Sequence, residues 1–167
     1  FPYTTLFRSI YRDLAEINPQ FFQPHVATTL NNLANLYSAK NEQDQAEAEY
    51  AEALKIYRSL AQVNQQAYLP YVAGILNNLG LLHSVKNEQD QAEAEFEEAL
   101  KIRRSLAEVN PQTYLPDVAM TAVNMGIFYQ DSIPDKEKSI AYCKEALRAA
   151  LPFLKYLPAV QNDATKA

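Results

Sequence analysis

The chain contains few of the residues that build crosslinked or loop-rich folds. Its 167 residues include three glycines, one cysteine and no tryptophan. Because Cys143 stands alone, neither a disulfide framework nor a cysteine-based metal site can form within one chain. The lone cysteine is also typical of a reducing compartment, so we expect a cytoplasmic protein. The three glycines are isolated from one another, which excludes a glycine-rich phosphate loop.

Clustered positive charge and long apolar runs are absent as well. The formal net charge is −5, and the lysines and arginines are scattered among more numerous acids. Binding to nucleic acid needs clustered cations to neutralise phosphates. No apolar run approaches the roughly 18 residues that a membrane helix needs. The sequence therefore predicts neither a nucleic-acid surface nor a membrane span.

What the chain does contain is a block of 46 residues that occurs twice almost unchanged and a third time in weaker form. Pro24, Pro70 and Pro116 are equally spaced along the sequence. The run NEQDQAEAE at residues 41–49 returns at residues 87–95. Equal spacing of this kind is typical of an array of stacked units rather than of a domain with one unique core.

Each unit has the pattern of two helices. In the first helix, apolar residues recur at helical spacing from Val26 to Tyr37, and the pattern repeats from Val72 and from Val118. We expect Pro24 to lie in the first turn of its helix, where a missing N–H costs nothing. The second helix follows Asn41 or Asn87, a residue type that tolerates the left-handed conformation at a helix end and can also cap the next helix.

Small residues recur where the two helices of a unit must approach closely. Ala34, Gly80 and Gly126 share one repeat position in the first helix, and Ala46 and Ala92 share one in the second. A larger side chain there would hold the helix axes apart and open voids beside the aromatic rings. Cys143 stands where the earlier units have an aromatic residue, so we expect it to be a small buried hydrophobe.

The first nine residues, FPYTTLFRS, match the translation of a common sequencing adapter. The repeat gives an independent check, because Phe7 and Arg8 stand where the next unit has Ala53 and Leu54. We therefore interpret residues 1–9 as adapter-derived and leave them out of the functional argument. The alternative is a divergent terminal repeat. On the adapter interpretation, the chain is a fragment of a longer reading frame and begins inside a helix.

These units resemble tetratricopeptide repeats. The family pattern of an apolar residue, Leu-Gly-x-x-Tyr and then Ala-x-x-x-Phe is matched by Leu30, residues 33–37, Ala46 and Tyr50. The standard repeat has about 34 residues. This longer unit is similar to the kinesin light chain group, whose pattern reads here as PHVATTLNNLANLY at residues 24–37.

The resemblance implies an all-α fold, a right-handed α-solenoid of antiparallel helix pairs. We expect a partial helix at residues 10–19, repeats at 22–65, 68–111 and 114–155, and a short C-terminal cap and tail at 156–167. The resemblance also implies that the first helices line a concave face, in agreement with the near absence of charge on their non-core side. The expected peptide-binding groove consists of Thr28, Asn31, Asn32, Asn35, Ser38, Gly74, Asn77, Asn78, Leu81, Met120, Asn124 and Ile127.

Asparagine is unfavourable inside helices, so its recurrence in the first helices needs a compensating role. A carboxamide can pair with the main chain of an extended peptide of any sequence. Similar asparagines contact cargo peptides in kinesin light chains. The alternatives are that these amides link neighbouring helices or face water.

A carboxylate clamp, a second binding mode of the family, requires cations at defined groove positions. The corresponding residues here are Asn31, Met120 and Asn124, so we do not expect a clamp. His25 and His83 occupy different repeat positions, and His83 replaces a tyrosine of the other units. No sequence spacing typical of a metal site occurs, and we expect no catalytic residues, cofactor or metal.

The sequence therefore predicts a non-enzymatic scaffold that binds a protein or peptide segment in an asparagine-lined groove. The alternative is an oligomerisation or regulatory module of a larger multidomain protein, with self-association through the open ends of the array. Binding of single-stranded RNA by helical repeats would need basic groove residues, which are missing.

Overall fold

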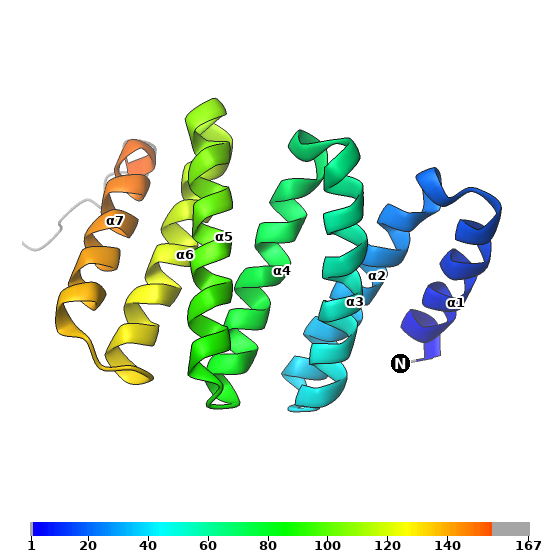
Figure 1. Ribbon diagram of the computed structural model, residues 1–167, viewed down its shortest axis with the longest axis horizontal. Coiled ribbons are helices and arrows are strands. Elements are labelled where there is room, and N and C mark those ends of the chain that lie inside the picture. The colour runs from blue at the N-terminus through cyan, green and yellow to red at the C-terminus, as the bar shows by residue number, and fades with distance from the viewer. Residues whose placement is uncertain (1, 155–167) are drawn as a thin grey trace, which may run out of the picture.

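The computed structural model describes residues 2–154, with side chains for residues 6–153. Within that range the chain forms seven helices and no strand, arranged side by side (Figure 1). Each helix packs against the next along the chain, and α4 also contacts α6. The prediction of an all-α solenoid of helix pairs is confirmed. The helices are α1 (Pro2–Ile17), α2 (Pro19–Ala39), α3 (Gln43–Val63), α4 (Gln65–Val85), α5 (Gln89–Val109), α6 (Pro111–Asp131) and α7 (Lys136–Leu154).

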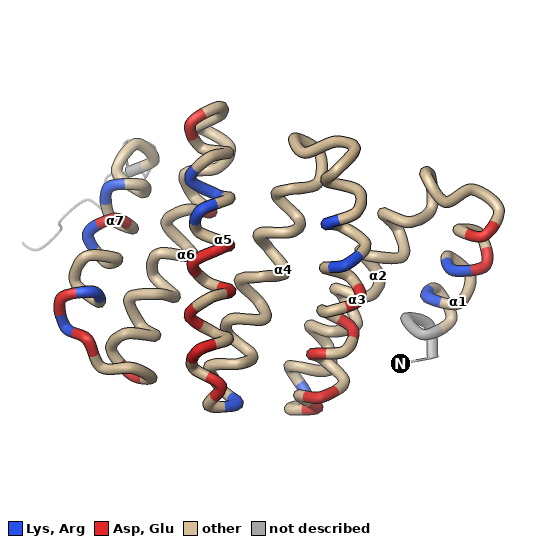
Figure 2. Tube along the Cα trace, viewed as in Figure 1, with Lys and Arg blue, Asp and Glu red and all other residues tan. Residues whose placement is uncertain are grey.

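The even-numbered helices form an inner layer, and α3, α5 and α7 form an outer one. Figure 2 shows the charged residues concentrated on α1, α3, α5 and α7, whereas α2, α4 and α6 carry almost none. The inner helices approach one another closely enough for α4 to contact α6 directly. The outer helices are bridged instead by long side chains, such as Arg58 to Glu98 at 2.6 Å. This asymmetry makes the inner layer the concave side of the array.

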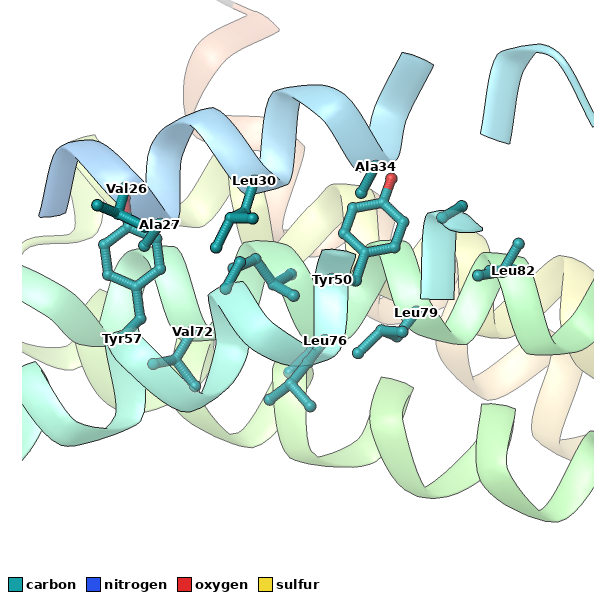
Figure 3. Packing of buried hydrophobic residues seen from close by; sticks show 14 of the residues in the cluster. Val26, Ala27, Leu30, Ala34, Tyr50, Tyr57, Val72, Leu76, Leu79 and Leu82 are labelled. Carbon is teal, nitrogen blue, oxygen red and sulfur yellow. The ribbon is translucent and has the colours of Figure 1, made fainter. Parts of the chain in front are cut away.

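Each helix pair is held together by apolar stripes that meet between the two layers. Ala34 and Ala46 are fully buried, and the rings of Tyr50 and Tyr57 fill the space between α2 and α3 (Figure 3). A Cβ atom added at Gly80 would lie 2.8 Å from the ring of Phe96. The ring therefore packs directly on the backbone of α4, as the recurrence of small residues at this position predicts.

The turn inside each of the first two pairs depends on a left-handed asparagine. Asn41 has φ 63° and Asn87 has φ 60°. Around Asn41, the N–H of Glu42 donates to the Tyr37 carbonyl and the N–H of Asn41 donates to the Ser38 carbonyl, both at 2.9 Å. This is the Schellman pattern, which satisfies carbonyls at the end of a helix. The expected capping of the next helix by the same asparagine does not occur, since its N-cap is Glu42.

The inner helices begin earlier than predicted. They start at residues 19, 65 and 111, so Pro24, Pro70 and Pro116 lie inside them rather than in the first turn. The signal missed is another 46-residue series, Asn18, Asn64 and Asn110. Each of these side chains accepts a hydrogen bond from the backbone N–H three residues later and thereby caps its helix. The helix start therefore follows the asparagine cap, and each proline lies in the second turn of its helix.

One further expectation fails near the C-terminal end, in α7, which contains Pro152 and continues to Leu154. Cys143 is exposed rather than buried, although a Cβ added at Gly126 would lie 2.8 Å from its sulfur. A small thiol on an outer helix leaves solvent access where an aromatic ring would close the gap. The predicted cap at residues 156–167 lies outside the described part of the chain, and the origin of residues 1–9 stays a prediction.

Two glycines of α4 distinguish the packing constraint from helix propensity. We expect Gly80→Leu to lower the thermal midpoint, because overpacking against Phe96 costs roughly 1–3 kcal/mol. Gly74→Ala is the matched control, since no heavy atom lies within 4 Å of a Cβ there, and alanine stabilises a helix by about 0.5–1 kcal/mol relative to glycine. Thermal melts followed by circular dichroism measure both; an unchanged midpoint for Gly80→Leu would contradict the packing.

Candidate functional site

A hollow of about 400 Å³ opens on the concave side of the array. Residues of all three inner helices line it, together with two side chains that reach it from the outer helices. Its wall combines amides, aromatic rings and one cation. The lining residues are Thr28, Asn31, Asn32, Tyr57, Pro70, Tyr71, Gly74, Ile75, Asn78, Arg103 and Met120.

Half of the residues expected to form a groove line this hollow. These are Thr28, Asn31, Asn32, Gly74, Asn78 and Met120. Leu81 and Ile127 are exposed further along α4 and α6, outside the hollow, and Ser38 and Asn35 are exposed further along α2. Asn77 and Asn124 are turned toward each other and join two helices. The binding roles of all twelve remain predictions.

The asparagines fall into two groups with different partners. Asn77 is only 3 % exposed, and its Oδ1 accepts a 2.9 Å hydrogen bond from Asn124 Nδ2, which joins α4 to α6. Asn35 Oδ1 accepts from Tyr50 at 2.5 Å and from Asn78 at 3.3 Å, which joins α2 to α3 and α4. These amides therefore link neighbouring helices, one of the alternatives left open by the sequence.

Asn31 and Asn32 differ from the linking asparagines. Both line the hollow, and within the described residues neither side chain makes a hydrogen bond. Their donors and acceptors are therefore available to a ligand on the concave side. Asn78 is intermediate, since its Nδ2 is used by Asn35 while its Oδ1 makes no bond among the described groups.

Two lining residues were missed because they belong to outer helices. Tyr57 of α3 stacks on Tyr71 at 4.8 Å and shares a hydrogen bond of 2.7 Å with the Thr28 hydroxyl. Burial raises the pKa of this tyrosine. Arg103 of α5 occupies the same repeat position one unit later. A charged residue in an otherwise apolar stripe was the available signal, and the sequence alone did not say where its head group would point.

Arg103 is a buried cation at the edge of the hollow. Arg103 is only 4 % exposed, and this burial lowers the pKa of its guanidinium. Nη1 donates to the Asp117 carbonyl at 3.0 Å and to the Thr121 hydroxyl. Nε has no hydrogen-bond partner in the described structure. The Asp117 carboxylate forms no close ion pair with the guanidinium, but its charge partly offsets the effect of burial on the pKa of Arg103. A buried cation that is compensated only at this longer range is costly, so an anion beside the guanidinium would be stabilised.

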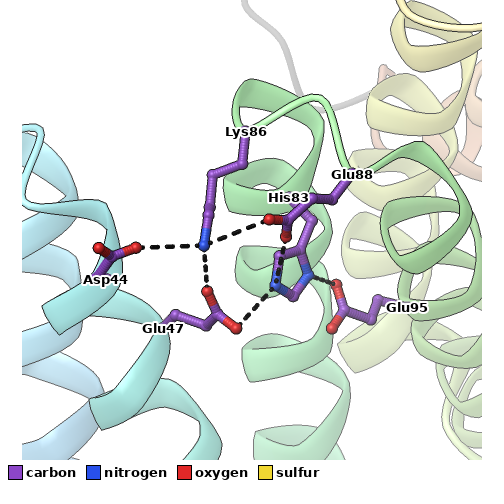
Figure 4. A network of polar contacts seen from close by, with 6 residues as sticks. All are labelled: Asp44, Glu47, His83, Lys86, Glu88 and Glu95. Atoms are coloured by element: carbon purple, nitrogen blue, oxygen red, sulfur yellow. Dashed lines mark hydrogen bonds and ion pairs between the residues drawn. The ribbon is translucent and has the colours of Figure 1, made fainter.

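A second polar cluster lies on the outer side, where α3, α4 and α5 meet (Figure 4). It contains His83, Glu47, Glu88, Glu95 and Lys86. A hydrogen bond from Lys86 lowers the pKa of Glu47, and burial raises the pKa of Glu95 against the opposing effect of His83. His83 is buried, as its repeat position predicts. The gathering of three carboxylates around it was not predicted, since they come from distant positions.

This arrangement defines an α-solenoid repeat array with a lined concave face. The tetratricopeptide repeat profile matches residues 26–65 and 72–111, the first two complete helix pairs. These two pairs therefore match tetratricopeptide repeats, and the resemblance drawn from the sequence is confirmed. Such repeats generally mediate contacts between proteins and typically serve as non-enzymatic scaffolds.

Among solved structures, the chain is similar to BtubC (BKLC) from P. vanneervenii, a kinesin light chain-like repeat protein. The two are 27% identical and superimpose with a TM-score of 0.70. The match covers 96% of this chain and 61% of that one, so the chain spans about three fifths of BtubC. No curated protein matches the chain significantly. None of the helices in the described residues has the length and apolar character to cross a bilayer.

The two groups of asparagines predict different responses to alanine. Asn77→Ala should destabilise the fold by about 1 kcal/mol, because it removes a buried hydrogen bond to Asn124. Asn32→Ala should be neutral or stabilising by up to roughly 0.7 kcal/mol, because it removes no bond and alanine is the better helix former. Urea unfolding curves measure both. Equal losses at the two positions would mean that Asn32 is also a structural link.

Proposed function

We propose that this chain is a scaffold that binds an extended segment of a partner protein on its concave face, with an acidic residue of that segment seated beside Arg103. The observation that carries the proposal is the hollow itself, because the unbonded amides of Asn31 and Asn32 and the buried guanidinium of Arg103, which has no close ion pair, all line it. Peptide binding on this face is the mode that the asparagines suggest from the sequence.

Each part of the wall suits a different part of a peptide. The amides of Asn31 and Asn32 can pair with main-chain N–H and C=O groups, which recur in every sequence. The exposed ring of Tyr71 and the side chain of Met120 offer apolar contact. Arg103 offers guanidinium N–H donors to a carboxylate, and a charge-assisted bond of this kind is stronger than a neutral one. The combination favours acidic over basic segments.

The experiment is a selection from a peptide library with the wild type, Arg103→Tyr and the double variant Asn31→Ala/Asn32→Ala. The wild type should enrich peptides with Asp or Glu at one fixed position. Arg103→Tyr should weaken binding to those peptides by about tenfold or more, because one charge-assisted hydrogen bond contributes roughly 1.5–3 kcal/mol. The double variant should weaken binding without changing the preferred sequence.

Arg103→Tyr is a suitable variant because the chain already carries Tyr57 at the same repeat position, and a thermal melt checks that it folds. Enrichment profiles that do not differ among the three proteins would contradict the proposed site. A wild type that enriches no peptide would contradict the proposed function.

A second candidate function is self-association, favoured by apolar side chains exposed on both end helices. Ile10 and Ile17 of α1 are 41 % and 81 % exposed, and Leu147 and Leu151 of α7 are about half exposed. The mass in solution distinguishes the two functions: a monomer at micromolar concentration argues against self-association. A cytoplasmic setting stays a prediction that rests on the single cysteine.

A further inference from the structure

We propose that His83, Glu47 and Glu88 form a binding site for a divalent transition metal, Zn²⁺ in the first instance, on the outer side of the array. The site lies on the layer opposite the peptide hollow and does not depend on the proposed function. Its three ligand atoms, one imidazole nitrogen and two carboxylate oxygens, lie within 4.8 Å of one another.

The position of His83 Nε2 is the central observation. The side chain is 5 % exposed, and Nε2 has no hydrogen-bond partner among the described residues. It lies 3.6 Å from Glu47 Oε1 and 3.6 Å from Glu88 Oε2. These distances are too long for hydrogen bonds. They suit two ligands of one ion, since metal–ligand bonds of 2.0–2.2 Å at tetrahedral angles place ligand atoms about 3.4 Å apart.

The other contacts of these groups leave the ligand atoms free. Lys86 Nζ takes the second oxygen of each carboxylate, Glu47 Oε2 at 2.5 Å and Glu88 Oε1 at 3.5 Å. His83 Nδ1 lies 2.7 Å from Glu95 Oε2. With the ring proton on Nδ1 and donated to Glu95, the Nε2 lone pair faces the two remaining oxygens. A carboxylate that holds the far nitrogen of a metal-binding histidine is the usual outer partner in such sites.

The backbone holds Glu88 in this position. The Schellman turn at the end of α4 pairs the Glu88 N–H with the His83 carbonyl at 2.8 Å, so the glutamate folds back over the histidine. The left-handed Asn87 makes this return possible. Glu47 comes from α3, so the site joins two helix pairs.

The two carboxylates of the site are open to solvent, and Nε2 lies buried behind them. A hollow of about 480 Å³ between α3 and α5 is lined by Glu47, Leu79, His83 and Glu95 among others. The side chains of Glu47 and Glu88 are 36 % and 38 % exposed. Water can therefore supply the fourth ligand. The local charge also favours a dication, because three glutamates and Asp44 surround one lysine.

The next unit shows what the same interface does without a histidine. There Tyr129 replaces His83 and Glu93 replaces Glu47. The Tyr129 hydroxyl donates directly to the Glu93 carboxylate, and Lys138 Nζ lies 3.1 Å from the hydroxyl. Burial, and secondly this bond to Glu93, raise the pKa of Tyr129 to about 12. A tyrosine closes the interface with a hydrogen bond. The shorter imidazole of His83 instead leaves a gap between its Nε2 and one oxygen each of Glu47 and Glu88.

The test is a titration of the whole chain with Zn²⁺, by calorimetry or against a chromophoric chelator. We expect one saturable site in the wild type and a thermal midpoint that rises with zinc and returns with EDTA. His83→Tyr reproduces the Tyr129 arrangement, so it should fold but lose the site. Glu95→Gln should weaken zinc binding about tenfold or more. His25→Gln is the matched control, since it changes the other histidine and should bind zinc like the wild type.

Two outcomes would overturn the proposal. One is the absence of saturable zinc binding to the wild type. The other is equal binding by His83→Tyr and the wild type, which would place the zinc on surface carboxylates elsewhere. Anomalous diffraction at the zinc edge gives an independent result, with a peak expected between His83, Glu47 and Glu88. Neither outcome bears on peptide binding by the concave face.

Discussion

The close approach of the two helices within each pair is the constraint on which this structure depends. At Gly80 the backbone of α4 lies against the ring of Phe96 with no room for a Cβ atom. At the equivalent place in the preceding pair, Ala34 and Ala46 are fully buried beside Tyr50. Small residues let the two apolar stripes interlock, and the buried rings then fill the space between the layers. The order of the array follows from repeating this contact.

The two layers differ in the length of the side chains that bridge successive units. Amides such as Asn77 and Asn124 join inner helices, and a short side chain can span only a short gap. Arginine and glutamate join outer helices, as in Arg104 to Glu145 at 2.6 Å, and these long chains span a wider one. The exposed ion pairs contribute little stability, roughly 0–1 kcal/mol each. The greater length of the bridging side chains on the outer layer is consistent with outer helices that lie farther apart than the inner ones.

Much of the fold could be predicted because local patterns carry it. The helical periodicity of the apolar residues predicted the two layers, and the 46-residue spacing predicted the array. The left-handed turns follow from the residue type of Asn41 and Asn87. The predicted helix starts at the prolines were wrong because each inner helix begins earlier, directly after a capping asparagine. The burial of Cys143 was wrong because a stripe position indicates orientation, and only neighbours decide whether a side chain is covered.

The functional surfaces were harder to predict because they combine residues from several units. Arg103 belongs to an outer helix, yet it bonds to Asp117 and Thr121 of the next inner helix. The cluster around His83 draws Glu47 from the preceding pair and Glu95 from the following helix. Sequence spacing alone cannot show that these groups meet. The repeat pattern predicted that the asparagines lie on the concave face. Which of their amides link helices and which make no hydrogen bond could be seen only in the structure.

Among the helices of residues 2–154, the main contacts of each helix are with its own or an adjoining pair, and this gives the array a modular character. The near-identical second block keeps the Arg58–Glu98 bridge and the Asn87 turn in register with their neighbours. A duplicated block therefore meets the same surfaces on both sides as the original did. Such a chain can lengthen in evolution by whole units. Residues that differ from the other units at the same repeat position, such as His83 and Arg103, can then give one unit a role that the others lack.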